Sequence, residues 1–410
     1  MSELGMLKDL LFGIEVEWKQ LGEVSTFLNG RAYKKPELLA EGKYPVLRVG
    51  NFFTNNSWYF SDLELNEDKY CDYGDLLYAW SASFGPRIWE GEKVIYHYHI
   101  WKVIPDDSLV IKKFLYYLLD WDAKSLKEES STGSTMLHIS KGSIEKRLVP
   151  IPCPDNPKKS LEIQAEIVRI LDTFTELTTE LTTELNARKK QYNYYRDQLL
   201  SFEEGEVEWK TLGGLTTDKF WIMPATPKFD ENEDVPYITS KNIRGGDIFF
   251  DKVKFISRDD FNNLSRNRPI LAGDFLISMI GTIGEIARVK KTDLDFYGQN
   301  MYLIRLDESL LHSGYFLHFF DSPKMKSHFN AVKNNSGQGY LKANNIDGIS
   351  VPVPSLSEQK RIAAILDKFD ALTNSITEGL PREIELRQKQ YEYYRDLLLS
   401  FPKPDTEAAD

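Results

Sequence analysis

The most regular pattern in the chain is an apolar stripe near its middle. Between Ile163 and Leu185 the apolar residues recur three or four positions apart, which is the period of one face of an α-helix. The stripe predicts a helix from about residue 161 to 201, roughly 60 Å long at about 1.5 Å per residue. The stripe consists of Ile163, Ile167, Ile170, Leu171, Phe174, Leu177, Leu181 and Leu185.

A second stripe of the same kind runs from Ile362 to Ile376. Ser355 and Glu358 precede it with the spacing of a capping box, in which the hydroxyl and the carboxylate satisfy N–H groups of the first turn. Gly379 and Pro381 then interrupt the pattern, because proline lacks an N–H and clashes with the preceding turn. We therefore expect a break or kink that the first helix lacks.

The regions outside these helices, residues 23–147 and 214–348, have the patterns of strands with some helix. Residues 44–50 and 235–240 are predicted to be equivalent strands, and Gly74 and Gly273 each begin a shared turn and strand. Alternating prolines at 149–152 and 351–354 predict extended segments that lead into the long helices, because proline continues neither a helix nor a central strand.

Two segments of the chain occur twice. Residues 188–202 return as 387–401 with 12 of 15 positions identical, and residues 16–22 return as 207–213. The regions that they enclose have little in common. This arrangement indicates two copies of one scaffold that present different surfaces. The start of the chain, residues 8–12, resembles residues 196–202, which suggests a circular order with an N-terminal helical segment packed beside the C-terminal helix. An unrelated amphipathic turn is the alternative.

Composition excludes several classes of protein. The chain has 410 residues, 41% of them apolar, so it can bury a large core in two or three domains. It has no run of 18 apolar residues and no signal-peptide pattern, which argues against a membrane span and secretion. Cys71 and Cys153 alone form no disulfide framework, which fits a reducing cytoplasm.

The net charge of −11 is spread unevenly. Residues 21–150 hold 16 Lys and Arg against 18 Asp and Glu, and residues 211–350 hold 17 against 17. The acidic excess therefore lies on the repeated segments and the tail, and the two divergent regions are free to hold local basic patches.

Catalytic motifs are missing from the sequence. The six histidines, at 97, 99, 138, 312, 318 and 328, include no His-Glu-x-x-His pair. No phosphate-binding loop occurs, nor an Asp/Asn-Pro-Pro-Tyr/Phe motif of amino-methyltransferases, and Gly281-Thr-Ile-Gly284 is too short for a dinucleotide loop. We interpret the chain as non-catalytic and without a metal site.

The head-to-tail pair of variable regions, each followed by a repeated helix, resembles the specificity (S) subunit of type I restriction–modification systems. The most specific feature is the run 175–185, Thr-Glu-Leu-Thr-Thr-Glu-Leu-Thr-Thr-Glu-Leu, directly before the repeated segment at residue 188. It is similar to the Thr-Ala-Glu-Leu repeat of the IC subclass, with Thr in place of Ala.

The resemblance implies two target-recognition domains that read the halves of a bipartite, asymmetric DNA site. It also implies two methyltransferase (M) subunits that methylate adenine, and restriction (R) subunits that join through them to cleave DNA. No cofactor is expected in this chain: S-adenosylmethionine would bind the M subunit, and Mg and ATP the R subunit.

The expected fold is α+β, with two mixed α/β target-recognition domains separated by two long antiparallel, coiled-coil-like helices in a pseudo-twofold circular arrangement. The expected segments are an N-terminal helical segment (1–15), recognition domain 1 (16–154), a central helix (155–205), recognition domain 2 (206–354), a C-terminal helix (355–401) and an acidic disordered tail (402–410).

The four-residue repeat also suggests that the length of the helix sets the spacing between the two recognition domains. Four residues advance a helix by about 6 Å and leave a net rotation of about 40°. One base pair of B-DNA turns by about 35°. Deleting Thr179–Thr182 should therefore shorten the tolerated DNA spacer by one base pair. The alternative is a solubilised coiled-coil segment of arbitrary length.

DNA readout needs side chains that reach base edges and cations that contact phosphates. His97 and His99 alternate on a predicted strand, and if Trp101 aligns with Tyr302, His99 lies opposite Asn300. Small polar loops before the proline segments would let the backbone approach a ligand. The candidates in the first region are Arg31, Tyr33, Lys34, Lys35, Arg48, Asn51, Ser81, Ser83, Arg87, His97, His99, Ser134, Thr135, His138 and Lys141. Those in the second region are Lys219, Lys241, Asn242, Arg244, Ser278, Thr282, Gln299, Asn300, Gln338, Tyr340 and Lys342. An ordinary surface loop is the alternative for each of them.

Aromatic residues in the repeated segments are candidates for contacts with partner subunits, with core packing as the alternative. They are Trp18, Tyr192, Tyr195, Trp209, Tyr391 and Tyr394. Two other classes of protein remain open: a complete DNA methyltransferase or nuclease, and a coiled-coil scaffold without DNA readout.

Overall fold

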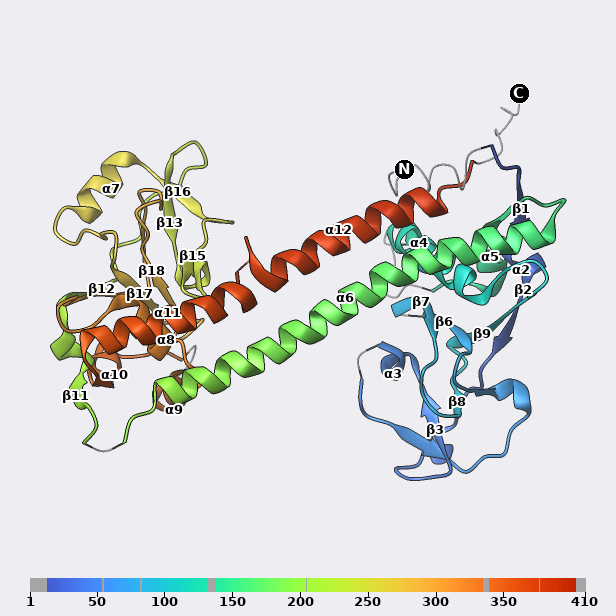
Figure 1. Cartoon of the computed structure of the whole chain (residues 1–410), viewed down its shortest axis with the longest axis horizontal. Coiled ribbons are helices and arrows are strands. Elements are labelled where there is room, and N and C mark those ends of the chain that lie inside the picture. Colours follow the sequence, from blue (N-terminus) through green and yellow to red (C-terminus); the bar gives the residue numbers. More distant parts are fainter. Residues whose placement is uncertain are drawn as a thin grey trace. The chain divides into compact units, whose positions relative to one another are not determined.

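The computed structural model describes residues 13–53, 55–81, 83–130, 138–203, 205–334, 339–375 and 377–402 (Figure 1). The chain forms two compact units. Unit 1 comprises Met1–Thr178 and Arg387–Asp410, and unit 2 comprises Thr179–Leu386. Each unit contains one mixed α/β domain and parts of the long helices. Most of the predicted N-terminal helical segment and of the tail lies outside the described residues.

The long helices have the predicted extent. Helix α6 spans Pro157–Leu199, whereas the second copy is divided into α11 (Leu356–Thr373) and α12 (Gly379–Leu399). Gly379 has a φ of +73°, and a Cβ atom there would lie 2.3 Å from the carbonyl oxygen of Ala371. The chain therefore needs glycine where α12 begins, and the predicted break is confirmed.

The start of α11 corrects one detail. The hydroxyl of Ser355 accepts a hydrogen bond from the N–H of Glu358 at 3.3 Å, as a cap should. The Glu358 carboxylate instead accepts two hydrogen bonds from Arg361, at 2.6 and 2.8 Å. The carboxylate half of the predicted capping box is therefore wrong, because a bidentate guanidinium is a stronger partner than a backbone N–H.

Unit 1 contains a four-stranded sheet of order β2-β9-β6-β7 and a second sheet of order β4-β3-β8-β5. The first sheet consists of β2 (Ser25–Asn29), β9 (Ile100–Pro105), β6 (Leu76–Ser81) and β7 (Ser83–Ile88). The second consists of β4 (Tyr59–Ser61), β3 (Tyr44–Leu47), β8 (Val94–Tyr96) and β5 (Tyr70–Cys71). The remaining elements are β1 (Val16–Gln20), paired with β10 (Leu148–Pro152), and α2 (Leu21–Val24), α3 (Val49–Phe53), α4 (Lys112–Ser130), α5 (Lys141–Glu145), η1 (Lys35–Glu37) and η2 (Glu67–Lys69).

Unit 2 repeats this plan with a four-stranded sheet of order β12-β20-β17-β18 and a three-stranded sheet of order β16-β13-β19. These strands are β12 (Thr216–Ile222), β20 (Met301–Leu306), β17 (Phe275–Ser278), β18 (Ile286–Arg288), β16 (Lys254–Ile256), β13 (Val235–Ile238) and β19 (Tyr297–Gly298). The remaining elements are β11 (Glu208–Thr211), paired with β21 (Ser350–Val353), and β14 (Ile243–Arg244), β15 (Asp247–Ile248), α7 (Arg258–Ser265), α8 (Ser313–Phe320), α9 (Pro323–Val332), α10 (Ala343–Asp347), η3 (Leu212–Leu215) and η4 (Ser240–Asn242).

The equivalences predicted between the two domains are confirmed. Strands β3 and β13 each pair antiparallel with one neighbour and parallel with another. Gly74 and Gly273 precede β6 and β17 with φ of +85° and +98°. The proline segments form β10 and β21, each of which pairs with a single strand and so leaves one edge without ladder bonds for proline to interrupt.

Side chains alternate between two cores along the central strands. Phe275 packs in the core that contains α8 and α11, whereas Leu276 packs in the core between the sheets of unit 2. Leu76 and Leu77 divide in the same way in unit 1. This alternation follows from the period of two residues in a strand.

A buried glutamine attaches each long helix to its domain. Gln164 of α6 accepts from the N–H of Ile111 at 2.9 Å and donates to the carbonyl two residues earlier at 2.9 Å. Gln359 of α11 makes the same pair of bonds at His312, at 2.7 and 3.0 Å. Both glutamines are fully buried. Because each amide satisfies both a donor and an acceptor of the domain backbone, it fixes the helix at one position.

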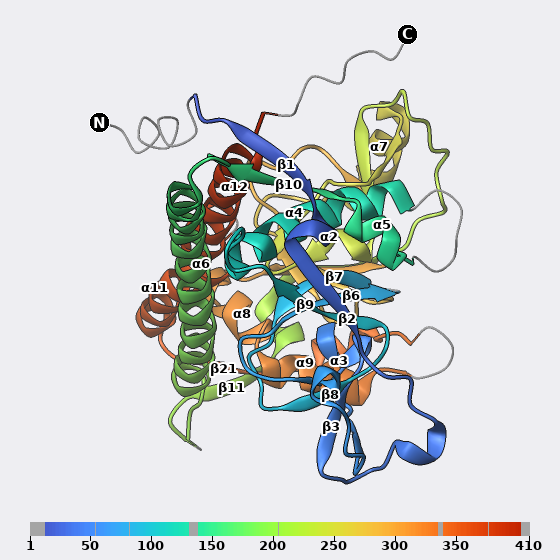
Figure 2. The ribbon, with the colours of Figure 1, turned by 90° about the vertical axis from the view of Figure 1, so that its right-hand side faces the viewer.

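The two ends of the described chain meet in unit 1. The indole N–H of Trp18 in β1 donates to the carbonyl of Pro402 at 2.8 Å, and β1 lies beside the end of α12 (Figure 2). Ile14 and Val16 pack in the core that also holds Leu398 and Phe401. These contacts agree with the predicted circular order.

Candidate functional site

In unit 1, aromatic rings gather where β6 ends and β8 turns into β9. The His99 ring lies 4.9 Å from both the Trp80 and the His97 rings, measured between centroids, and the His138 ring lies 5.9 Å from Trp80. The exposed Tyr98 ring contacts His99 at 3.9 Å. We call these five residues the ring cluster. The structure therefore brings all three candidate histidines of the first region together.

The Trp80 indole fixes the position of the other rings of the cluster. Its N–H donates to the carbonyl of Tyr98 at 2.8 Å, and its ring stacks on the buried Trp101 with centroids 5.6 Å apart. The backbone of Trp80 also accepts from the N–H of Ile139, which fixes the neighbouring His138. Trp80 and Tyr98 were not predicted as site residues, although Tyr98 lies between the two alternating histidines.

Two histidines of the ring cluster, His97 and His99, are held in their neutral form. Burial, followed by the charges of His99 and Arg48, lowers the pKa of His97 to about 4. Burial and the neighbouring His138 also lower the pKa of His99. At neutral pH each of these rings therefore offers one donor and one acceptor nitrogen.

Other candidates of the first region surround the ring cluster. Tyr33 stacks with His97 at 6.3 Å, and the guanidinium of Arg31 lies 5.2 Å from the Tyr33 ring while pairing with Glu37 at 2.8 Å. Arg48 lies over the Tyr59 ring at 4.3 Å. The hydroxyl of Tyr33 and the Nε of Arg48 are buried without a hydrogen-bond partner. Unsatisfied buried polar atoms are uncommon and often mark functional surfaces.

Unit 2 brings a different set of groups to the corresponding place. The backbone N–H of Met279 donates to the carbonyl of Asn300 at 3.2 Å, and the backbone N–H of Leu341 donates to Met279 at 3.0 Å. Ile280 forms a bridge with Tyr340, and the Tyr237 hydroxyl donates to Gln299 at 3.4 Å. We call Gln299, Asn300 and Tyr340 the amide cluster.

Backbone pairing establishes which residues correspond. Trp80 donates its N–H to His99 as Met279 does to Asn300, and the N–H groups of His97 and Gln299 donate to the ends of β3 and β13. The predicted alignment of His99 with Asn300 is therefore confirmed. Tyr98 is an additional residue of unit 1 in this turn.

The Asn300 backbone is held in a strained conformation. Its φ is +65°, which is uncommon outside glycine and better tolerated by asparagine than by most residues. Its N–H donates to Ile222 at 2.9 Å and its carbonyl accepts from Met279. The backbone thereby fixes the direction of the half-buried side chain. Because strained backbone conformations occur mostly at functional sites, Asn300 is a functional candidate.

Two candidate asparagines support loops. The amide of Asn51 donates to the carbonyls of Asn55 and Ser57 at 3.0 and 2.7 Å, and the amide of Asn242 donates to Phe249 and Asp251 at 2.9 and 3.3 Å. Their amide hydrogens are therefore used within the fold.

The remaining candidates divide into those near the clusters and those away from them. Thr282 donates to the carbonyl of Ser240 at 2.7 Å and contacts the buried Ser278 at 3.2 Å, so these residues support the loop that carries the exposed Lys241. Ser81 is buried beside His138, and Lys141 and Lys342 follow shortly after the bridged His138 and Tyr340.

Several candidates lie elsewhere. Lys219 pairs with Asp347 at 3.2 Å, and Arg244 pairs with Asp251 and lines a cleft of about 1010 Å³ beside α11. Arg87, over the Phe52 ring, lies at the opposite end of the β6–β7 hairpin from Trp80. Ser83, Lys34 and Lys35 are exposed. Ser134, Thr135 and Gln338 lie outside the described residues.

The candidate partner-binding aromatics are in mixed environments. Tyr192 is 5% exposed, and its hydroxyl contacts Nδ1 of His318 at 3.0 Å. Tyr394 stacks on Phe174 at 5.1 Å, as the exposed Tyr195 does on Phe369 at 5.6 Å. The half-buried Tyr391 packs against the core of unit 1. Trp18 is bonded to Pro402, whereas Trp209 is 43% exposed.

Across the described residues, no group of three His, Cys, Asp or Glu side chains could hold a metal ion. None of the helices in this part of the chain has the length and apolar character needed to cross a membrane.

Comparisons with known proteins agree with one another. Residues 14–190 and 206–386 each match the family model described as Type I restriction modification DNA specificity domain. The chain is 37% identical to the type I restriction enzyme EcoR124I/EcoR124II specificity subunit of Escherichia coli, over 99% of either chain. It is 33% identical to the type I restriction enzyme EcoprrI specificity subunit of the same species, over 92% of this chain and 93% of the relative.

Two solved structures show the same fold. The S subunit of a type I restriction–modification system from M. genitalium superposes with a TM-score of 0.56 at 17% identity, covering 96% of this chain and 98% of that one. A chain from a study of complex assembly and conformational transition of the type I R-M system gives 0.59 at 14% identity, covering 96% and 99%. The predicted fold class of two repeated mixed domains with long helices is confirmed.

Proposed function

The chain belongs to the type I restriction–modification DNA specificity family, and we propose that its ring cluster and amide cluster are the surfaces with which it reads DNA. As a specificity subunit it recognises DNA and leaves catalysis to other subunits. Each cluster would read one half of a bipartite, asymmetric site.

One observation carries the proposal. The same backbone position, fixed by equivalent hydrogen bonds, holds His99 in unit 1 and Asn300 in unit 2. The two domains share sheet order, turns and helix attachment. A shared frame with different hydrogen-bonding groups at one surface position is what two unlike half-sites require.

The chemistry of each cluster fits a different kind of base edge. An Asn amide can donate and accept at once, which matches N6 and N7 of adenine in the major groove. The neutral rings of His97 and His99 each present one donor and one acceptor, and the exposed Tyr98 ring supplies apolar surface for a thymine methyl group. Unit 2 would thus prefer an adenine at its central contact.

Exposed cations of the two domains would contact phosphates. Lys34 and Lys35 are exposed and show no ion pair in the described part of the chain, and Lys241 and Lys342 are exposed near the amide cluster. Affinity should therefore fall steeply with salt, because phosphate contacts release counterions. Asn51, Asn242, Ser278 and Thr282 would support the reading loops rather than contact bases.

The assembly follows the family. We propose that two methyltransferase subunits bind this chain and methylate adenine with S-adenosylmethionine, and that restriction subunits, which use Mg and ATP, join through them. We also retain the domain boundaries 16–154 and 206–354 for the recognition domains, with residues 155–205 and 355–401 as the connecting helices.

A map of N6-methyladenine in cells with and without this chain tests the proposal. We expect a split, asymmetric motif that disappears with the chain, and the variant Asn300→Ala should relax one half of it. Methylation by the purified chain alone would instead indicate a complete methyltransferase. A full complex that binds no duplex would favour a scaffold without DNA readout.

A further inference from the structure

The two units differ at one point of their shared frame. Gln164 and Gln359 bind equivalent backbone groups around Ile111 and His312, so positions 201 residues apart correspond in the helices that follow. By this correspondence Trp121 of α4 matches Ser322, where α8 has ended and α9 begins at Pro323. A large indole in unit 1 is therefore replaced by a small hydroxyl in unit 2.

Trp121 fills a defined place in unit 1. Its indole N–H donates to the carboxylate of Asp396 at 3.0 Å, and its ring packs against the core of unit 1. In the repeated segment Asp396 corresponds to Asp197 of α6. The matching place in unit 2 therefore keeps the carboxylate and lacks the indole.

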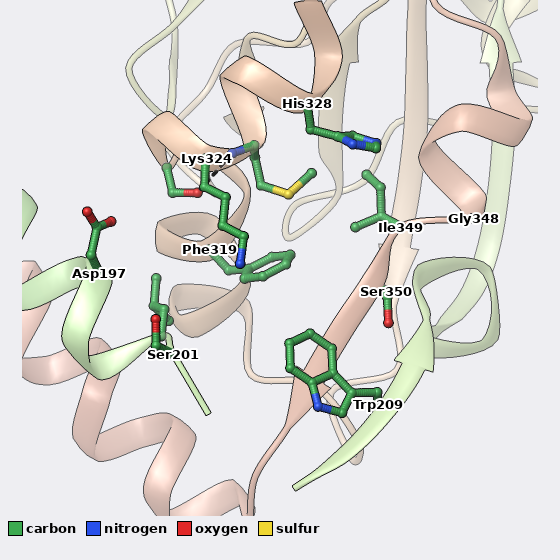
Figure 3. A pocket seen from close by; sticks show the side chains of 12 residues that line it. Asp197, Ser201, Trp209, Phe319, Lys324, His328, Gly348, Ile349 and Ser350 are labelled. Atoms are coloured by element: carbon green, nitrogen blue, oxygen red, sulfur yellow. Dashed lines mark hydrogen bonds between the residues drawn. The ribbon is translucent and has the colours of Figure 1, made fainter. Parts of the chain in front are cut away.

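The matching place in unit 2 is a pocket of about 530 Å³ (Figure 3). Asp197 and Ser201 lie on one side of it, Trp209 and Ser350 on the other, and Phe319 lies between them. Leu200, Met325 and Ile349 complete its apolar lining. We call it the Trp209 pocket.

Two polar groups at the Trp209 pocket have no partner in the described residues. The Asp197 carboxylate makes no hydrogen bond or ion pair there, whereas its counterpart Asp396 accepts from Trp121. The Trp209 indole is 43% exposed and its N–H has no acceptor there, whereas its counterpart Trp18 donates to the carbonyl of Pro402 at 2.8 Å. The pocket thus offers one acceptor and one donor beside apolar walls.

We propose that the Trp209 pocket binds a tryptophan or tyrosine side chain of the methyltransferase subunit, in the position that Trp121 occupies in unit 1. The ring would fill the apolar lining and donate its N–H or O–H to Asp197. A backbone carbonyl of the same segment would accept from Trp209, as Pro402 does from Trp18. This inference rests on the proposed function, because it assumes a methyltransferase partner.

The charges around the pocket refine the expected segment. Lys324 also lines it, so an acidic residue beside the aromatic one would be favoured. The carboxylate of Asp197 disfavours DNA as the occupant. The chain's own terminal segments, residues 1–12 and 403–410, contain neither tryptophan nor tyrosine, so they cannot supply the ring.

Variants of the full chain, purified with the methyltransferase subunit, test the proposal. Ser322→Trp should fill the pocket and weaken binding of one of the two methyltransferase subunits by about tenfold or more, since aromatic anchors dominate interfaces. Asp197→Asn and Trp209→Phe, which keep the pocket's shape, should each weaken it by about fivefold to tenfold. The first replaces a charged acceptor by a neutral one, and the second removes a donor. Gln198→Ala, at the next position of α6, should have no effect. Titration and native mass spectrometry measure affinity and subunit number.

Ser322 also caps α9 by accepting from the N–H of Met325 at 3.3 Å, so Ser322→Trp could fail to fold. In that case the affinities of Asp197→Asn and Trp209→Phe for the methyltransferase subunit test the proposal. A photo-crosslinking residue at the rim, Lys324→p-benzoylphenylalanine, should capture a methyltransferase segment that contains a tryptophan or tyrosine. Capture of a segment without either residue, of DNA or of a second copy of this chain would overturn the proposal.

Unchanged affinity in both Asp197→Asn and Trp209→Phe would also overturn it. The proposed DNA function fails separately, through loss of a split methylation motif in the wild-type complex. A wild-type complex that methylates such a motif, together with variants that bind both methyltransferase subunits normally, would reject the pocket assignment alone.

Discussion

The two units share one arrangement of sheets and helices but carry different residues at the surface proposed to read DNA. Each attaches its helix with a buried glutamine, stacks a phenylalanine on a tyrosine, and orders its larger sheet in the same way. At the proposed reading surface, Trp80 and His99 of unit 1 correspond to Met279 and Asn300 of unit 2. The frame can thus keep its packing while the reading groups change.

The frame tolerates this change because the reading groups lie at strand ends. Tyr98 adds a residue to the turn between β8 and β9 without altering the ladder of β9, and Asn300 instead adopts a positive φ in the shorter turn. Insertions and unusual backbone conformations cost least where no ladder bond depends on them. New specificity can therefore arise without loss of the core.

The largest effect is expected from changing the helix between the readers while leaving both readers intact. The Thr-Thr-Glu-Leu repeat is helical in α6, and the hydroxyl of Thr183 donates to the carbonyl of Thr179 at 2.9 Å. Deleting Thr179–Thr182 removes about 6 Å of helix and about 40° of rotation. We expect methylation of the original motif to fall to background and a motif with one fewer spacer base pair to replace it.

Sequencing of methylated DNA measures this switch. An equal-length control, with alanine at each of residues 179–182, should keep the original spacer. A deletion variant that still methylates the original spacing would show that the repeat does not set the distance.

The next largest effect is a loss of stability when the buried glutamine that attaches each long helix to its domain is replaced. Gln164→Leu or Gln359→Leu leaves a buried N–H and carbonyl without partners, at a cost of about 2–4 kcal/mol in each unit. Both variants should lower the unfolding midpoint by similar amounts. Hydrogen exchange should quicken at Ile111 in the first variant and at His312 in the second. Gln198→Leu, at an exposed position of α6, is the control. Strongly unequal effects would contradict a shared attachment.

Removing the proposed reading side chain of each unit tests whether the two units contact different half-sites. His99→Ala and Asn300→Ala should each cost about 1–3 kcal/mol of discrimination, which is about 5-fold to 150-fold in rate, at one base pair of one half-site. Methylation of duplexes with single substitutions measures this loss. The unaltered half-site serves as the internal control in each variant. Equal weakening on all duplexes would instead indicate phosphate contacts.

Much of the architecture could be predicted from the sequence because it rests on periodic patterns and repeated segments. The stripe from Ile163, the break near Gly379 and the alignment of Trp101 with Tyr302 are each visible as spacing. The buried Gln164 and Gln359 were missed, since a glutamine on a helix gives no sign that its amide meets a distant backbone.

The site was predicted less completely for a similar reason. Asn51 and Asn242 have the residue type expected of base contacts, but their amides hold loops through carbonyls that sequence does not place nearby. Trp80 was missed because its ring acts through Tyr98 and Trp101, which only the sheet register brings beside it. Residue type suggests possible chemistry, and tertiary contacts decide whether a side chain is free to perform it.

The smallest expected effect is a difference in the pH dependence of stability. The ring cluster contains histidines, whereas the amide cluster contains none. The folded-state pKa of His97 is about 4, below its ordinary value of 6.5, and that of His99 is also lowered. Between pH 6.5 and 4 the unfolded chain therefore binds more protons than the folded chain, so the stability of unit 1 falls as pH falls. Above about pH 6.5 both states are neutral at these rings and the stability contribution is constant.

We expect the unfolding midpoint of the wild-type chain to fall relative to that of the double variant His97→Gln, His99→Gln as pH drops from 6.5 to 4. The difference between the two midpoints should stay constant from pH 6.5 to 8. Asn300→Gln, which adds no titrating group, should follow the wild-type profile throughout and is the matched control. A wild-type midpoint that rises relative to that of the double variant toward low pH would mean that the rings gain protons on folding, and the neutral-ring mode of readout in unit 1 would then be wrong.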